Sequence, residues 1–217
     1  MDRDKVLNAI LDTGVVAILR ASSSNQLLTA AEAVLAGGVI AIEVTMTTPN
    51  ALEVIHQATA QFGERVLFGV GSVLDSETAR AAILSGAQFV VCPSLNLGTI
   101  QICRRYSVPV MPGAYTPTEI LTAWEAGADV VKIFPASVGG PDFIKALRGP
   151  LPHIRFAAVG GVDLTTTARF FQAGVSVVGI GGELVNQKLL DSRDFALITE
   201  RARSFRQQAD EGRGRSG

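Results

Sequence analysis

Short apolar segments recur along the chain and indicate its architecture. They begin roughly 20–26 residues apart, which is about the length of one strand–helix unit. They are continuous rather than alternating and are rich in β-branched residues, as is typical of parallel strands covered on both faces. The predicted strands span Val15–Arg20, Ala41–Met46, Val66–Ser72, Gln88–Ser94, Val108–Ala114, Val130–Ala136, Arg155–Gly161 and Val177–Glu183.

Amphipathic segments with helix-start signals lie between these strands. Asp75 and Thr116-Pro117 are typical first residues of helices, because a side-chain oxygen there accepts a bond from a free backbone N–H and proline fits the first turn. Alternating strands and helices form either a closed barrel or an open, doubly wound sheet. The even spacing and the absence of a second domain favour the barrel.

The sequence therefore predicts an α/β protein with one (β/α)8 TIM-barrel domain over residues 1–206. We expect an extra N-terminal helix, Asp2–Asp12, to close the bottom of the barrel. A last long helix, at about Asp191–Gln207, is expected to complete the outer ring. Residues 207–217 are polar and glycine-rich, so we expect a disordered tail there.

Composition narrows the class of protein. Of the 217 residues, 47% are hydrophobic, and the formal net charge is −1 at pH 7. Without a basic stripe, nucleic acid is not an expected partner. Without an apolar run of about 18 residues, no membrane span is expected. The charged N-terminus lacks the apolar core of a signal peptide, so we expect a cytoplasmic protein. We expect Cys92 and Cys103 to be buried thiols, with a disulfide as the alternative.

Barrel enzymes carry their chemistry at the C-terminal ends of the strands, and Lys132 stands out there. It lies inside an apolar run, where an ammonium is costly to bury. Burial would lower its pKa and leave a neutral amine able to attack a ketone. The alternative is a lysine held in a buried salt bridge.

Two further charged residues end strands or interrupt them. Glu43 lies between Ile42 and Val44, and is expected to serve either as a general acid/base or as the ion-pair partner of Lys132 or Arg20. Arg20 ends the first strand and suits a substrate carboxylate, because its guanidinium binds carboxylates through two hydrogen bonds. The alternative for Arg20 is an exposed loop arginine.

Small and hydroxylated residues complete the expected site. Thr45, Thr47 and Ser72 offer hydroxyls to a substrate or to an ordered water. Glycine pairs follow the last two strands, at the place where barrels often bind phosphate through bare backbone N–H groups. These are Gly160-Gly161 and Gly181-Gly182. His56 and His153 fall away from strand ends, so neither a zinc site nor another metal or cofactor is expected.

Several motifs resemble those of the 2-keto-3-deoxy-6-phosphogluconate (KDPG) / 4-hydroxy-2-oxoglutarate (KHG) aldolase family. The resemblance spans nearly the whole chain. It rests on Val16-Ala-Ile-Leu-Arg20, Ile42-Glu-Val-Thr45 with Thr48-Pro49, Gly69-Val-Gly-Ser-Val73, Gly86-Ala-Gln-Phe89, Val110-Met-Pro-Gly113, Lys132-Ile-Phe-Pro135, Phe143-Ile-Lys-Ala-Leu147 and Val159-Gly-Gly161.

The resemblance implies specific roles. Lys132 would be the Schiff-base lysine, Glu43 the proton shuttle, and Arg20 the partner of the substrate carboxylate. Pro93 and Phe134 would pack around bound pyruvate. The glycine pairs would hold a distal phosphate. The family is also typically a homotrimer that needs no metal.

This chain departs from the family pattern on the distal side. Thr47 stands where some members have Arg, and Val159 where some have Thr. Gly182-Glu183 stands where some have Ser. A glutamate there would repel a phosphate dianion if its side chain turned inward. The departures leave the Schiff-base chemistry untouched.

The expected function is a class I lyase that cleaves a 2-keto-3-deoxy-6-phospho sugar acid, KDPG or its galacto epimer, to pyruvate and glyceraldehyde 3-phosphate. The first alternative is a 4-hydroxy-2-oxoglutarate aldolase that yields pyruvate and glyoxylate. Alternatives of other classes are a sugar-phosphate isomerase or epimerase, which would need no lysine nucleophile, and a non-catalytic barrel that only binds a metabolite.

Overall fold

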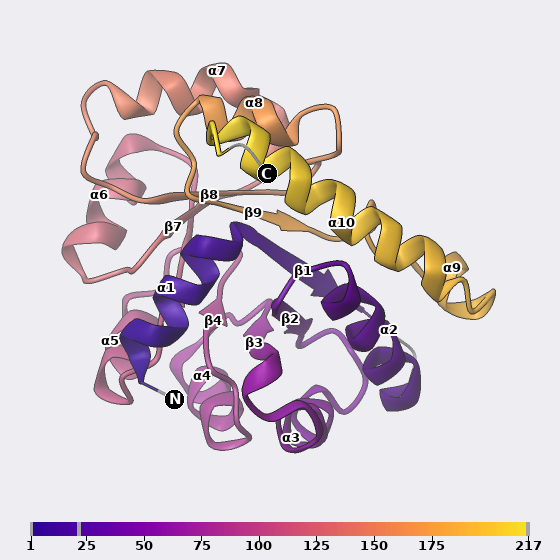
Figure 1. Ribbon diagram of the computed structural model, residues 1–217. Helices are drawn as coiled ribbons and strands as arrows, with labels where there is room; N and C mark the ends of the chain where they lie inside the picture. The colour runs from indigo at the N-terminus through magenta and orange to yellow at the C-terminus, as the bar shows by residue number, and fades with distance from the viewer. Residues whose placement is uncertain (1, 21–22, 216–217) are drawn as a thin grey trace.

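The computed structural model describes residues 2–20 and 23–215, and its short strands form a barrel ringed by helices (Figure 1). All strand pairs in it are parallel, and the first strand pairs with the last, as a barrel requires. The predicted TIM-barrel fold is confirmed. The strands are β1 Val15–Leu19, β2 Ala41–Thr45, β3 Leu67–Gly71, β4 Val90–Val91, β5 Val110–Met111, β6 Gly113–Ala114, β7 Val131–Ile133, β8 Phe156–Val159 and β9 Val177–Ile180.

The predicted fifth strand is divided at Pro112 into β5 and β6. β5 pairs with β4, whereas β6 pairs with β7, so the two halves of one segment join the two edges of the sheet. Proline has no N–H to give to a ladder. The carbonyl of Pro112 still accepts a hydrogen bond from the Lys132 N–H at 2.9 Å. The covalent chain therefore closes the barrel where the hydrogen-bonded ladder is interrupted.

Helices follow the strands and cover the outside of the barrel. Two predicted helix starts are confirmed: the Asp75 carboxylate accepts from the Thr78 N–H at 2.6 Å, and Thr116 forms a capping box with Glu119. The helices are α1 Arg3–Thr13, α2 Ser24–Ala36, α3 Ala51–Phe62, the 3-10 helix η1 Gly63–Arg65, α4 Ser76–Leu84, α5 Leu97–Arg105, α6 Pro117–Glu125, α7 Ala136–Arg148, α8 Thr167–Gln172, α9 Gln187–Asp191 and α10 Phe195–Gly212.

Two apolar clusters hold these layers together. The larger one lies between the strands and the helices and includes Phe68 and Phe156. The smaller one fills the barrel interior, where Leu7 and Ile10 of α1 pack with inward-facing residues such as Phe89. Because α1 buries its apolar face in this interior, it closes the N-terminal end of the barrel, as the sequence predicted.

The prediction of a disordered tail from residue 207 is wrong over most of its length. α10 continues through Gly212 because its far end has partners. Arg206 donates to the carbonyl of Thr13 at 2.6 Å, and Arg213 donates to the carbonyl of Leu11 at 2.8 Å. These bonds satisfy carbonyls that the end of α1 leaves free. Residues 216–217 of the predicted tail lie outside the described residues.

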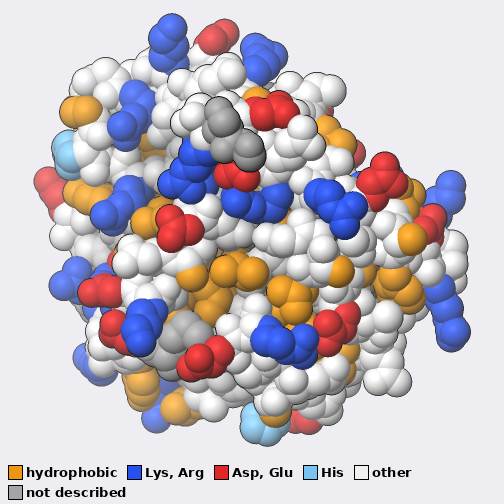
Figure 2. Space-filling model, in the orientation of Figure 1, with side chains coloured by type: hydrophobic (Ala, Val, Ile, Leu, Met, Phe, Trp, Pro, Cys, Tyr) orange, Lys and Arg blue, Asp and Glu red, His pale blue; other side chains and the backbone are white. Residues whose placement is uncertain are grey.

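Charges are mixed on the face seen in Figure 2. Lysine and arginine side chains alternate there with aspartate and glutamate, and no single sign dominates. This distribution agrees with the net charge of −1. Among the described residues, no helix is long and apolar enough to cross a membrane.

Candidate active site

A cavity of about 330 Å³ opens at the C-terminal ends of the strands. All of the predicted site residues except Thr45 and Thr47 line it. The lining consists of Ile18, Arg20, Glu43, Ser72, Pro93, Lys132, Phe134, Val159, Gly160, Gly161, Val162, Gly179, Gly181, Gly182 and Glu183.

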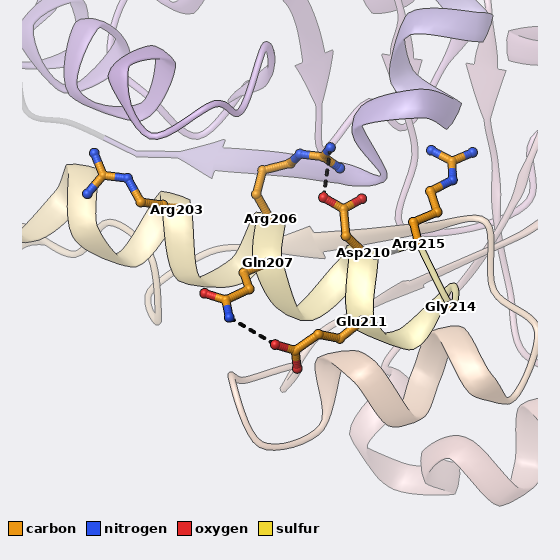
Figure 3. A pocket seen from close by; sticks show the side chains of 7 residues that line it. All are labelled: Arg203, Arg206, Gln207, Asp210, Glu211, Gly214 and Arg215. Carbon is orange, nitrogen blue, oxygen red and sulfur yellow. Dashed lines mark hydrogen bonds and ion pairs between the residues drawn. The ribbon is translucent and has the colours of Figure 1, made fainter. Parts of the chain in front are cut away.

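A larger hollow of about 580 Å³ lies elsewhere, on the outer surface of α10 (Figure 3). The polar side chains along it largely pair with one another. Arg206 lies 3.0 Å from Asp210, and Gln207 donates to Glu211 at 2.9 Å. No predicted site residue lines this hollow. The barrel mouth is therefore the candidate active site, although it is not the largest hollow.

Lys132 extends from β7 into this mouth cavity and is only 5% exposed. Its ammonium lies 4.7 Å from the centroid of the Phe134 ring. Within the described part of the chain it makes no side-chain hydrogen bond and no ion pair, so the buried salt bridge considered as an alternative is not formed. Burial lowers the pKa of Lys132, and the nearby charge of Glu43 only partly opposes this.

Glu43 reaches the same cavity from β2 and is 3% exposed. Burial raises the pKa of its carboxyl, while the charges of Lys132 and Arg20 act in the opposite direction. Gly71 on β3 makes room for this group, because a Cβ there would overlap the Glu43 carboxylate. The sequence reasoning missed Gly71. A glycine interrupting a buried strand beside the one that carries Glu43 was the available signal.

The glycine pairs present bare backbone to the cavity. Gly160 and Gly161 have φ of 91° and 72°, in the left-handed region that glycine adopts without strain. Among the described residues, the N–H groups of Gly160, Gly161, Gly181 and Gly182 donate no hydrogen bond. The Arg20 guanidinium lies beside Gly181, since a Cβ on that glycine would stand 3.4 Å from Nη1. Free N–H groups and one arginine are suited to an anionic group.

Thr45 and Thr47 do not line the cavity, contrary to expectation. Thr45 is fully buried, and its hydroxyl lies 2.8 Å from that of Thr47 and 3.4 Å from that of Thr48. The hydroxyls therefore satisfy one another in the turn after β2. Three lining residues were missed instead: Ile18, Val162 and Gly179. Ile18 and Gly179 each lie two positions before a predicted site residue in the same predicted strand, so alternation along the strand was the available signal for these two.

The cysteines are buried and not joined in a disulfide. Burial raises the pKa of Cys92 and of Cys103 to about 12, so neither is a thiolate near neutral pH. Over residues 2–20 and 23–215, no group of three or more histidine, cysteine, aspartate or glutamate side chains is placed to hold a metal ion.

The fold and the cavity define an α/β-barrel protein with a buried lysine and a buried carboxyl side by side at the mouth. Comparison with known proteins then gives the particular family. The family model for KDPG and KHG aldolase matches residues 6–201, and the chain belongs to this family. It is therefore an enzyme of the lyase class, an aldolase.

Individual relatives agree with this assignment. The 2-dehydro-3-deoxy-6-phosphogalactonate aldolase of Escherichia coli is 37% identical over 171 residues, which cover 78% of this chain and 83% of that protein. The KHG/KDPG aldolase of the same organism is 32% identical over 198 residues, or 90% and 92% of the two chains. The solved KDPG aldolase of Legionella pneumophila, with pyruvate captured at low pH as a covalent carbinolamine intermediate, has a TM-score of 0.86 at 25% identity and covers 94% and 98%.

Proposed function

We propose that this protein is a class I aldolase in which Lys132 forms a Schiff base with a 2-keto acid. Its proposed substrate is a 2-keto-3-deoxy-6-phospho sugar acid, of gluco or galacto configuration, which it cleaves to pyruvate and glyceraldehyde 3-phosphate. One observation carries the proposal: the Lys132 amine is buried at the cavity, has no ion-pair partner among the described residues and has a lowered pKa. A neutral amine is the form that attacks a carbonyl carbon.

The first half of the reaction builds the electron sink. The neutral Lys132 nitrogen attacks C2 of the keto acid, and the carboxyl of Glu43, whose pKa is raised by burial, gives a proton to the former carbonyl oxygen. A proton then passes from the carbinolamine nitrogen to its hydroxyl, which leaves as water. The product is an iminium that joins the lysine nitrogen to C2.

The second half breaks the carbon–carbon bond. The Glu43 carboxylate takes the proton of the C4 hydroxyl, and the electron pair of the C3–C4 bond moves to form an enamine. The C4 fragment leaves as an aldehyde. Glu43 then gives that proton to C3. Water attacks C2 of the renewed iminium and passes a proton back to Glu43 as pyruvate and the Lys132 amine are released.

The other lining residues have supporting roles in this proposal. The family resemblance assigns Arg20 to the substrate carboxylate, and the position of its guanidinium beside Gly181 also brings it next to the proposed phosphate site. The hydroxyl of Ser72 lies in the same cavity. Pro93 and Phe134 pack against the pyruvate half. The bare N–H groups of the two glycine pairs receive the distal phosphate. Thr45 and Thr47 are left out, because their hydroxyls bond to each other away from the cavity.

A second candidate substrate is 4-hydroxy-2-oxoglutarate, which would yield pyruvate and glyoxylate through the same steps. The similarity to a KHG/KDPG aldolase supports it. The isomerase and non-catalytic alternatives are set aside, because the chain belongs to an aldolase family. Pyruvate release should be assayed with the two phosphorylated epimers, their unphosphorylated counterparts and 4-hydroxy-2-oxoglutarate. We expect the highest kcat/KM with one of the phosphorylated epimers.

Borohydride trapping tests the Schiff base directly. Reduction in the presence of pyruvate should leave a stable adduct on Lys132, located by peptide mass mapping. Lys132→Met should abolish the adduct. Lys145→Met, which changes an exposed lysine on α7, should retain it. An adduct on another lysine, or none at all, contradicts the proposed mechanism.

We also propose that the chain acts as a homotrimer in the cytoplasm, as the family resemblance implies. The chain mass is 22.8 kDa. Light scattering of the purified protein should give about three times this value, and a monomer or dimer mass would reject the trimer.

A further inference from the structure

The charged side chains that line the mouth cavity can be compared with the charges that a phosphorylated substrate would carry. Charged side chains in the lining are those of Arg20, Glu43, Lys132 and Glu183. Burial favours the neutral forms of Glu43 and Lys132. The formal charges of Arg20 and Glu183 are opposite and sum to zero. A phosphorylated keto acid brings a carboxylate and a phosphate that carries nearly two negative charges at pH 7.

Glu183 stands next to the groups proposed to receive that phosphate. It directly follows Gly181-Gly182, in a turn fixed by hydrogen bonds from the N–H groups of Leu184 and Val185 to the Gly181 carbonyl at 2.9 and 3.0 Å. Its own carbonyl accepts from Arg201 at 2.9 Å, which holds its backbone in place.

The carboxylate of Glu183 is exposed and makes no hydrogen bond or ion pair within the described part of the chain. Glu183 lines the cavity, and over residues 2–20 and 23–215 no ion-pair partner offsets its charge there. The free N–H groups of Gly181 and Gly182 can donate to a phosphate oxygen or to a hydroxyl oxygen, and the bond to the charged phosphate is the stronger of the two. The carboxylate, in contrast, repels a dianion and leaves a hydroxyl unaffected.

We infer that Glu183 is a specificity-determining residue that reduces the advantage of a phosphorylated 2-keto acid over its unphosphorylated counterpart. The inference rests on the proposed function and refines its substrate class. The enzyme accepts both forms, and their kcat/KM values lie closer together than the anion-binding glycine loops alone would give.

A charge series at this position tests the inference. Glu183→Gln should raise the ratio of kcat/KM for the phosphorylated over the unphosphorylated acid by about tenfold, the change that corresponds to about 1.4 kcal/mol. Glu183→Lys should raise it further. The change should arise in KM of the phosphorylated acid, and kcat/KM for the unphosphorylated acid should stay within about twofold. Glu64→Gln, an equal charge change at an exposed position on η1, should leave the ratio unaltered.

Salt provides a readout that a merely structural role would not move. The difference between the parent enzyme and Glu183→Gln should shrink as ionic strength rises, because exposed charges are screened over about 8–10 Å at physiological salt. The inference is overturned if the substitutions change both substrates by the same factor, if the ratio does not follow the charge at position 183, or if the effect is insensitive to salt.

Borohydride trapping of Glu183→Gln with pyruvate separates this inference from the proposed function. An adduct on Lys132 with an unchanged substrate ratio overturns only the role of Glu183. Absence of the adduct in the parent enzyme removes the proposed function and this inference with it.

Discussion

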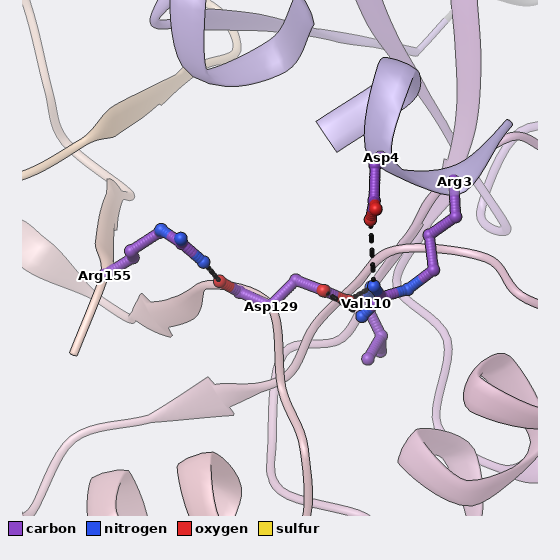
Figure 4. A network of polar contacts seen from close by, with 5 residues as sticks. All are labelled: Arg3, Asp4, Val110, Asp129 and Arg155. Atoms are coloured by element: carbon purple, nitrogen blue, oxygen red, sulfur yellow. Dashed lines mark hydrogen bonds and ion pairs between the residues drawn. The ribbon is translucent and has the colours of Figure 1, made fainter. Parts of the chain in front are cut away.

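The two ends of the barrel differ in how their buried charged side chains are partnered. We call the N-terminal end, which α1 closes, the floor, and the C-terminal end with the cavity the mouth. Asp129 and Lys132 lie three positions apart along one segment, and each is 5% exposed. At the floor, the Asp129 carboxylate accepts from the Val110 N–H at 2.9 Å and pairs with Arg3 of α1 (Figure 4). At the mouth, Lys132 has no such partner among the described residues. Two equally buried charged side chains therefore differ in their partners: Asp129 is held by an ion pair and a hydrogen bond, whereas Lys132 has neither among the described residues.

The first prediction concerns Glu43 at the mouth. Glu43→Gln should lower kcat by roughly 10²–10⁴-fold, because the amide cannot relay protons. The unfolding free energy should not fall, since burial already favours the neutral carboxyl that glutamine resembles in shape. Steady-state kinetics and urea unfolding measure the two quantities. Near-normal turnover would remove Glu43 from the mechanism.

The second prediction concerns Asp129 at the floor. Asp129→Ala should cost about 3–5 kcal/mol of unfolding free energy, because it removes the buried partner of Arg3 and leaves the Val110 N–H without an acceptor. Activity per folded molecule should be unchanged. Asp4→Ala is the matched control, because Asp4 touches the same arginine at 3.3 Å but is 74% exposed, and it should cost about 0–1 kcal/mol. An equal loss of unfolding free energy in the two variants would contradict the proposed stabilising role of the buried Asp129 pair.

The third prediction is the smallest and concerns pH. Lys132 has a folded-state pKa below its ordinary value of 10.5, so between these two values the unfolded chain binds more protons at this site. Stability contributed by this site therefore rises with pH across that window, by at most about 1.4 kcal/mol per pH unit. Lys132→Met removes the effect. The unfolding free energy of Lys132→Met, relative to that of the parent protein, should therefore fall as pH rises through the window. A difference that stays constant with pH would contradict the lowered pKa.

Much of this architecture follows from local pattern. Continuous β-branched runs indicate buried parallel strands, and Asp75 and Thr116 mark helix starts by short-range hydrogen bonding. The break at Pro112 was not predicted. The sequence of this segment predicts one continuous strand. It is divided because its first half, β5, pairs with β4, whereas its second half, β6, pairs with β7.

The candidate site shows the same limit. Lys132 and Glu43 are conspicuous because ionisable groups are rare inside apolar strands. Thr45 had the right chemistry at a strand end, but its hydroxyl is satisfied by Thr47, and such a contact cannot be read from composition. The continuation of α10 was missed for a related reason: Arg213 donates to the carbonyls of Leu11 and Asp12, about 200 positions earlier in the chain, and no local signal in the sequence reveals such a contact.

The link from Arg213 back to α1 has a consequence for the order in which the molecule is made. A ribosome releases α1 first. The carbonyls of Leu11 and Asp12 can accept their hydrogen bonds from Arg213 only after that residue, near the other end of the chain, has been synthesised. The strand next to α1, β1, likewise waits for β9. The native contacts of α1 and β1 with the C-terminal part of the chain therefore cannot form until almost the whole chain has been translated.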